Sequence, residues 1–202
     1  MVGMGESIYD LPTTTYVSVS VASIERHHMS KQHKRPKLTI VAAMGENQVI
    51  GNKGALPWDM PADLAHFKAV TLGKPVIMGL NTYKAIGRLL PGRTNIILSH
   101  IAEPIDGAVV AHSIDEALAA VADVDEACVI GGQRIFEQFL SMVDRIELTV
   151  IHATPAGDTY FPVLADDEWK ITHREEHTSD ERNKNDYTFL TYERVQSDRD
   201  LR

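Results

Sequence analysis

The most informative carboxylate in the sequence is Asp63, which follows Pro61 by two residues at the expected start of a helix. Proline is favoured at the first helical position because an N–H would have no helical partner there. Leu64 and Phe67 follow at helical spacing and make the neighbouring face apolar. A carboxylate in an apolar cleft can pair with a cationic or amidine-like heterocycle, whereas one in a first helical turn can simply stabilise the helix dipole. Position alone leaves both interpretations open.

Two strand-to-helix turns have compositions that suit phosphate binding. Residues 78–82 are Met-Gly-Leu-Asn-Thr, and residues 130–134 are Ile-Gly-Gly-Gln-Arg. Glycine lets a ligand approach the backbone, and a helix start presents free N–H groups and the positive end of a dipole. Two such turns on one sheet suit a pyrophosphate, and both can equally be ordinary turns.

Two larger side chains complete the candidates. Arg93 follows a Pro-Gly turn and has the geometry to grip a carboxylate through two parallel hydrogen bonds, or it is simply solvated. Trp58 follows Pro57 and is interpreted either as the anchor of a lid or as a core residue.

Alternating strands and helices are predicted to position these residues. Short apolar runs indicate buried strands, and late strands without a helix between them indicate an antiparallel hairpin. The sequence therefore predicts an α/β fold, with a mostly parallel central sheet, an antiparallel C-terminal edge and flanking helices. The predicted strands are residues 38–44, 75–79, 95–99, 107–111, 127–130, 145–151, 169–176 and 187–193, and the helices begin at Pro61 or span residues 81–86, 113–121 and 133–140.

Composition excludes several classes of protein. The 202 residues carry a formal net charge of -8 and contain one cysteine, Cys128. A single cysteine excludes an internal disulfide framework and a cysteine-based zinc cluster. An acidic chain lacks the basic surface that nucleic-acid binding needs, and no run approaches the roughly 18 apolar residues of a membrane span. We expect no metal, no nucleic-acid partner and no membrane, with Cys128 as a buried core thiol.

The first 36 residues differ from the rest. A Thr/Ser-rich segment precedes a basic, His-containing run that closes at Pro36, which is the reverse of the order in a secretory signal. Glu6, Asp10 and Glu25 argue against a mitochondrial presequence. We therefore expect a disordered extension over residues 1–36, one domain over residues 37–202, and a cytoplasmic protein.

The common dinucleotide, P-loop, nucleophile-elbow and zinc-protease motifs are absent from the sequence. Several other segments, in matching order and spacing, resemble bacterial dihydrofolate reductases over about residues 37–195. These segments are Leu56-Pro57-Trp58, Pro61-Ala62-Asp63-Leu64, Phe67-Lys68, residues 71–79, Ile86-Gly87-Arg88, Leu90-Pro91-Gly92-Arg93, residues 95–99, residues 129–132 and Gly157-Asp158-Thr159.

The resemblance implies reduction of 7,8-dihydrofolate to tetrahydrofolate by NADPH, which supplies one-carbon metabolism. Asp63 matches the family's single active-site carboxylate, which hydrogen-bonds the pterin and favours protonation of N5 before hydride reaches C6. Thr149 matches the threonine that supports this carboxylate. Trp58 and Leu56 match the mobile loop over the nicotinamide, and Gly157-Asp158 the loop that braces it. The residues matched to substrate binding are Val41, Ala42, Leu64, Phe67, Lys68, Ile86, Leu90, Ile130 and Arg93, with Arg93 on the glutamate α-carboxylate.

The resemblance also implies a cofactor site, a monomer, and binding of antifolates such as trimethoprim or methotrexate in the substrate site. The residues matched near the nicotinamide are Ala43, Ile50, Gly51, Gly131 and Gly132, with a cis peptide between the two glycines. Those matched to the phosphates and the adenosine are Asn81, Thr82, Leu98, Ser99, His100, Gln133, Arg134, Ile135 and Thr159.

One position departs from the family pattern. Many members carry an arginine directly after the Met-Gly of the second strand, where this sequence has Leu80. Arginine is a principal ligand of the 2′-phosphate in this family. We expect NADPH to be preferred nonetheless, through Ser99, His100 and a nearby lysine.

Two other functions remain as alternatives. One is the riboflavin-pathway reductase, which acts on a ribosylated pyrimidine on the same fold. The other is a folate- or nucleotide-binding protein without activity. Asp63, Trp58 and Arg93 argue against the first, and Asp63 and Trp58 argue against the second. Turnover of a phosphorylated, folate-free substrate would support the first.

Overall fold

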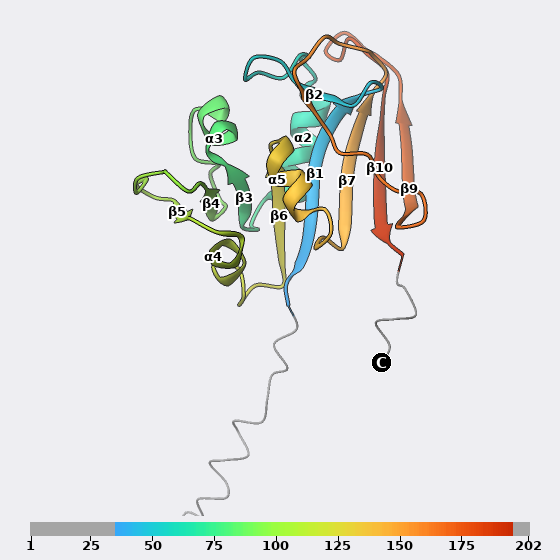
Figure 1. The fold of residues 1–202 in the computed structure, drawn as a ribbon. Coiled ribbons are helices and arrows are strands. Elements are labelled where there is room, and N and C mark those ends of the chain that lie inside the picture. The colour runs from blue at the N-terminus through green and yellow to red at the C-terminus, as the bar shows by residue number, and fades with distance from the viewer. Residues whose placement is uncertain (1–34, 196–202) are drawn as a thin grey trace, which may run out of the picture. The chain divides into compact units, whose positions relative to one another are not determined.

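The computed structural model describes residues 35–195. Residues 1–34, nearly all of the expected extension, and residues 196–202 lie outside the described part. The main sheet consists of β1 (Lys37–Gly45), β3 (Val76–Gly79), β4 (Asn95–Leu98), β5 (Val109–Ala111), β6 (Glu126–Gly131), β7 (Arg145–Ile151), β9 (Trp169–His177) and β10 (Tyr187–Arg194). Their order across the sheet is β5-β4-β3-β6-β1-β7-β10-β9 (Figure 1).

The strand directions confirm the predicted fold class. Every pair from β5 to β7 is parallel, whereas β10 runs antiparallel to both β7 and β9. The predicted C-terminal hairpin is therefore the edge of the sheet. The observed strands differ from the predicted ones by no more than two residues at either end.

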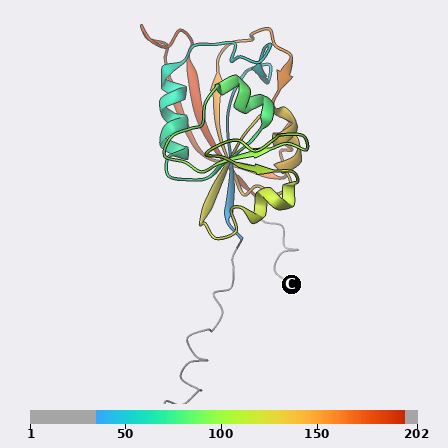
Figure 2. The same cartoon turned by 90° about the vertical axis from the view of Figure 1, so that its left-hand side faces the viewer.

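Helices cover both faces of the sheet (Figure 2). On one face lie α2 (Pro61–Thr71) and α3 (Leu80–Ile86), and on the other lie α4 (Ile114–Ala119) and α5 (Gln133–Phe139). Alternate residues of the central strands point to opposite faces. Accordingly Val41 packs with Phe67 of α2, and Ile40 belongs to the cluster that contains Phe136 of α5. Burial on both faces explains why the strands are short, continuous apolar runs.

A second, two-stranded sheet was not predicted. It pairs β2 (Val49–Gly51) with β8 (Thr159–Tyr160) in antiparallel fashion, and no strand was predicted in either segment. Strands of two or three residues are too short to show alternation, and their partners are distant in the chain. The pairing is therefore a tertiary property.

Cys128 is free and fully buried in β6. Burial raises the pKa of its thiol to about 12, which confirms the predicted core thiol. Within residues 35–195, no helix has the length and apolar character needed to cross a membrane.

Candidate active site

Asp63 is a buried carboxylate, 7% exposed, in the first turn of α2. Burial raises the pKa of the Asp63 carboxyl above its ordinary value. A hydrogen bond from the Thr149 side chain and the charge of His66 lower the pKa, by smaller amounts. The structure thus brings Asp63 and Thr149 together, although 86 positions separate them in the numbering.

The start of α2 is held by Asn183, a residue that sequence reasoning missed. The helix has no side-chain cap of its own, and Pro61 has no N–H to offer. The Oδ1 of Asn183 accepts a hydrogen bond from the N–H of Ala62 at 3.0 Å, while its amide nitrogen donates to Asp180. A cap contributes about 0.5–2 kcal/mol, and this one fixes the residue that precedes Asp63. No local signal points to a cap 121 positions away.

The sheet opens beside this carboxylate. The pairing of β1 with β6 ends at Ile40 and Val129, and a bulge interrupts the pairing of β6 with β3. Ile130 therefore has no register partner within the described sheet. On the other side of β1, Ala43 is the partner of Thr149. The carboxyl ends of parallel strands at such an opening are where α/β sheets bind ligands.

Apolar side chains surround the opening. Leu64 and Leu56 are about half exposed, at 54% and 50%. Phe67, Ile86 and Leu90 are partly buried at the edge of the cluster on the α2 face. Exposed apolar surface of this kind suits the faces of an aromatic ligand.

Arg93 lies next to Phe67, one of these apolar side chains. Its Nη1 donates to the Thr71 hydroxyl at 2.9 Å, and its Nε donates to the carbonyl of Pro91 at 3.1 Å. The guanidinium carbon lies 5.9 Å from the ring centroid of Phe67. These contacts hold an arginine in a set orientation beside an apolar surface.

Trp58 carries a buried donor. Its side chain packs in the cluster that contains Met60, Ile151 and Tyr187. The indole Nε1 is buried and has no hydrogen-bond acceptor within residues 35–195. An unpaired buried donor is costly, so this N–H fits an acceptor on a bound molecule.

The segment before Trp58 is braced by the loop around Gly157 and Asp158. The Asp158 N–H donates to the carbonyl of Gly51 at 3.0 Å, and the Lys53 N–H donates to the Asp158 carboxylate at 2.9 Å. Hydrogen bonds to this carboxylate lower the pKa of Asp158. A Cβ on Gly157 would lie 2.2 Å from Cγ1 of Val49, so only glycine allows this approach.

The Gly131-Gly132 turn lies between two helix starts. Its peptide bond is cis, as the resemblance implies. A Cβ on Gly132 would lie 3.3 Å from Oγ1 of Thr82, so the starts of α3 and α5 are adjacent. The Gln133 side chain is already engaged, since it accepts from the Tyr160 N–H and donates to a glutamate of its own helix.

The corner after β4 contains an imidazole that the sequence analysis did not single out. Nδ1 of His112 lies 3.0 Å from the carbonyl oxygen of Ser99. His100 is exposed beside it. Leu80, at the position where the family often has arginine, packs against the cluster on the α2 face. Ser99 and His112 are therefore in contact at this corner.

The remaining predicted residues are distributed over the elements that border the opening. Lys68 is exposed on α2. The others lie at the carboxyl ends of β1 and β4, in β2 and β8, or in the first turns of α3 and α5: Ala42, Ile50, Leu98, Thr159, Asn81, Arg134 and Ile135.

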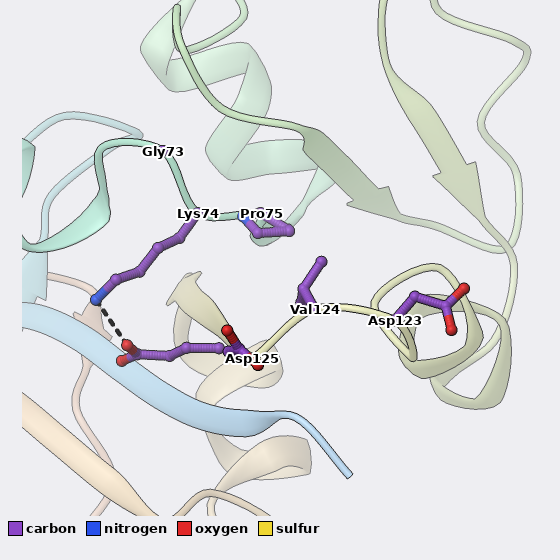
Figure 3. A pocket seen from close by; sticks show the side chains of 7 residues that line it. Gly73, Lys74, Pro75, Asp123, Val124 and Asp125 are labelled. Atoms are coloured by element: carbon purple, nitrogen blue, oxygen red, sulfur yellow. Dashed lines mark ion pairs between the residues drawn. The ribbon is translucent and has the colours of Figure 1, made fainter. Parts of the chain in front are cut away.

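A partly open cavity lies at the opposite ends of the central strands (Figure 3). It is lined by Gly73, Lys74 and Pro75 before β3, and by residues 123–126 before and at the start of β6. Lys74 Nζ pairs with Glu126 Oε2 at 2.8 Å. Since this cavity lies at the amino ends of the parallel strands, it is separate from the opening beside Asp63.

Comparison with known proteins identifies relatives of this arrangement. A family model described as "Dihydrofolate reductase" matches residues 37–194. Dihydrofolate reductase type 3 of Salmonella typhimurium is 43% identical over 158 residues, which are 78% of this chain and 98% of that protein. The dihydrofolate reductase of Haemophilus influenzae is also 43% identical, over 75% of this chain and 95% of that protein.

A solved structure shows the same similarity in three dimensions. It is the dihydrofolate reductase of Enterococcus faecalis complexed with NADP(H) and RAB-propyl. It superposes with a TM-score of 0.76 at 33% identity, and the match covers 80% of this chain and 98% of that one.

Proposed function

The chain belongs to the dihydrofolate reductase family, and we propose that it transfers hydride from NADPH to C6 of 7,8-dihydrofolate with Asp63 as the active-site carboxylate. The products are 5,6,7,8-tetrahydrofolate and NADP⁺, and the proton that balances the reaction is added at N5. The observation that carries the proposal is a buried carboxylate, supported by Thr149, beside the opened carboxyl ends of β1 and β6.

Asp63 and its neighbours have complementary tasks. The carboxylate is proposed to accept hydrogen bonds from the pterin 2-amino group and N3, which would satisfy a buried charge. This pairing orients the ring and favours protonation of N5. Backbone carbonyls of Val41 and Ile130 are proposed to face the pterin edge, since Ile130 lies outside both strand ladders. Leu64, Phe67, Ile86 and Leu90 would exclude water from the rings.

The chain also has residues that fit NADPH. NADPH supplies the hydride when it is bound. Gly131 and Gly132 have no side chains, so a pyrophosphate could approach the backbone of this turn closely. Thr82 and the N-termini of α3 and α5 lie next to it, and helix N-termini present free N–H groups to phosphate. Arg134 in the first turn of α5 is proposed to add a cation there, whereas Gln133 would contribute its backbone because its side chain is engaged.

A spectrophotometric assay with dihydrofolate, run with NADPH and then with NADH, tests the function. Oxidation of NADPH that trimethoprim inhibits is the expected result. Absence of NADPH oxidation would overturn the proposal and favour the non-catalytic alternative. Turnover of a ribosylated pyrimidine in place of dihydrofolate would favour the riboflavin-pathway reductase, which the relatives named above do not support.

Replacement of Arg93 by Gln is expected to raise KM for dihydrofolate by about 10- to 100-fold with little change in kcat. A charge-assisted hydrogen bond contributes about 1.5–3 kcal/mol, and the glutamate tail is remote from the reacting atoms. Steady-state kinetics measures both constants. Arg174→Gln, on exposed β9, is the matched control, and an unchanged KM for the Arg93 variant would contradict its assignment.

NADPH is expected to have the higher kcat/KM of the two cofactors despite Leu80. Ser99, His100 and His112 are the groups proposed to contact the 2′-phosphate. His100→Ala and His112→Ala are each expected to lower kcat/KM for NADPH by about fivefold, which corresponds to the loss of an ordinary hydrogen bond of about 1 kcal/mol, and to leave kcat/KM for NADH unchanged. Equal kcat/KM for the two cofactors in the wild type would refute this assignment.

The proposal extends to the physical state of the enzyme. We expect a cytoplasmic monomer that binds trimethoprim or methotrexate in the substrate site. Light scattering on the full chain measures the oligomeric state, and inhibition that is competitive with dihydrofolate identifies the antifolate site.

A further inference from the structure

The turn between β9 and β10 reaches the start of α2. Asn183 lies in this turn and is buried, with 5% of its surface exposed. Its Oδ1 accepts a hydrogen bond of 3.0 Å from the N–H of Ala62, the residue directly before Asp63. The capping side chain of a helix normally comes from the residue at the N-cap position. Since Met60 at that position makes no such bond, a distant segment supplies the cap.

The orientation of the Asn183 amide follows from its contacts with Asp180. The amide nitrogen lies 3.1 and 3.0 Å from the two carboxylate oxygens of Asp180, to which it donates. A reversed amide would place its oxygen against the carboxylate and its NH₂ group against the N–H of Ala62, and both contacts would be repulsive. The backbone N–H of Asn183 also donates to Asp180, at 2.7 Å. The oxygen that faces α2 is therefore held in place by Asp180.

The turn that carries Asn183 is closed by further hydrogen bonds. The N–H of Ser179 donates to the Asp186 carboxylate at 2.7 Å. The N–H of Asp180 donates to the carbonyl of Asn183 at 2.8 Å. The carbonyl of Asp186 accepts from the N–H of His152, which directly follows β7, at 2.9 Å. Asn183 is thus attached to the central sheet through contacts that do not involve α2.

The place of Asp63 depends on the first turn of α2, to which it belongs. Pro61 has no N–H to contribute, and the hydrogen bond from the Leu64 N–H to the Met60 carbonyl is 3.3 Å long. The first N–H groups of a helix have no partner within the helix and need one from elsewhere. Without the bond from Ala62 to the turn, the first helical turn is expected to fray and the carboxylate to move with it.

We propose that Asn183 is a positioning residue for the reduction, which sets the place of the Asp63 carboxylate through the start of α2. The inference rests on the proposed role of Asp63. Alignment of a bound ring with the carboxylate is sensitive to small displacements, since about 1 Å of misplacement costs on the order of 10²-fold in rate.

Replacement of Asn183 by Ala removes the acceptor. The single-turnover rate of hydride transfer from bound NADPH is expected to fall by about tenfold, as for a displacement of less than about 1 Å. We expect KM for dihydrofolate to rise by about threefold, because the same carboxylate orients the substrate. The Kd of NADPH should stay within about twofold of the wild type, since most of its proposed contacts are on other elements. Stopped-flow kinetics and fluorescence titration measure these quantities.

A matched control separates positioning from stability. The Ser113 hydroxyl accepts from the N–H of Glu116 at 3.1 Å and caps α4, on the opposite face of the sheet from α2. Ser113→Ala therefore removes a helix cap of the same kind away from Asp63. It should lower the midpoint of urea unfolding to an extent comparable with Asn183→Ala, and keep the single-turnover rate at saturating NADPH within about twofold of the wild type.

An exchange of side chains provides the rescue. Asn183→Asp alone places two carboxylates against each other and should slow hydride transfer at least as much as Asn183→Ala. With Asp180→Asn added, the carboxylate at position 183 accepts from Ala62, while the amide at position 180 donates to it and accepts from the backbone of the turn. The double variant is expected to recover the single-turnover rate to within about threefold of the wild type.

The outcomes distinguish failure of the inference from failure of the function. If Asn183→Ala is destabilised as Ser113→Ala is but keeps the wild-type single-turnover rate and KM, Asn183 serves folding alone and the inference is wrong. A folded double variant that stays slow would also contradict it, since the exchanged pair should restore the cap. If Asp63→Asn retains wild-type kcat/KM, the proposed role of Asp63 fails, and the inference fails with it.

Discussion

Replacement of Asp63 by Asn is expected to lower kcat/KM for dihydrofolate by about 10²- to 10⁴-fold, the range typical of a lost acid–base group. The variant keeps the shape and a hydrogen-bond acceptor for Thr149, but it loses the charge that favours N5 protonation. Stopped-flow measurement of NADPH oxidation tests the effect on the chemical step. Asp59→Asn, an exposed neighbour before α2, is the control and should behave as the wild type.

The same variant is expected to be more stable than the wild type at pH 7. Burial raises the pKa of Asp63 in the folded protein above its value in the unfolded chain. Ionisation of this carboxyl group therefore lowers the free energy of unfolding of the wild type. The loss of stability begins as the pH rises past the unfolded-state pKa, and it is complete above the folded-state pKa. Urea unfolding over a series of pH values measures this effect, and the advantage of Asp63→Asn should shrink as the pH falls through the folded-state pKa towards the unfolded-state pKa. A less stable variant at pH 7 would contradict the electrostatic account.

Replacement of Gly157 by Val is expected to slow hydride transfer by about 10²-fold, although the residue touches no reacting atom. A Cβ at this position would lie 2.2 Å from Cγ1 of Val49 and 2.6 Å from the carbonyl of Gly51, so the two segments must separate. The displacement would break the Asp158 contacts that brace the segment leading to Trp58. Misplacement of about 1 Å costs on the order of 10²-fold in rate.

Single-turnover kinetics with bound NADPH measures the effect of Gly157→Val. Ala156→Val adds comparable bulk at the exposed neighbouring position and should leave the rate within about twofold of the wild type. A wild-type rate for Gly157→Val would show that the brace is not needed for catalysis. A fall in stability without a fall in the single-turnover rate would assign Gly157 to folding alone.

The order and type of the main elements could be predicted from the amino-acid sequence. Burial patterns repeat locally along a strand or helix, so Ile40 and Val41 on opposite faces of β1 and Pro61 at the start of α2 were recognisable without any partner. The resemblance also predicted that Asp63 and the Gly131-Gly132 turn belong to one active site, because motifs that follow a family's order are expected to adopt that family's arrangement in space.

The contacts between distant segments around Asp63 could not be predicted from the sequence and are seen in the folded structure. The cap from Asn183, the stack of His66 on Phe189 and the pairing of β2 with β8 each join segments far apart in the chain. Such contacts leave no periodic pattern, because one residue on each side is enough to make them. Burial of Asp63 was equally inaccessible, since a carboxylate in a first helical turn is solvated or desolvated according to what packs over it. The sequence thus determined which side chains are available for the chemistry, and the packing of α2 against β7 and β10 decided the environment in which they act.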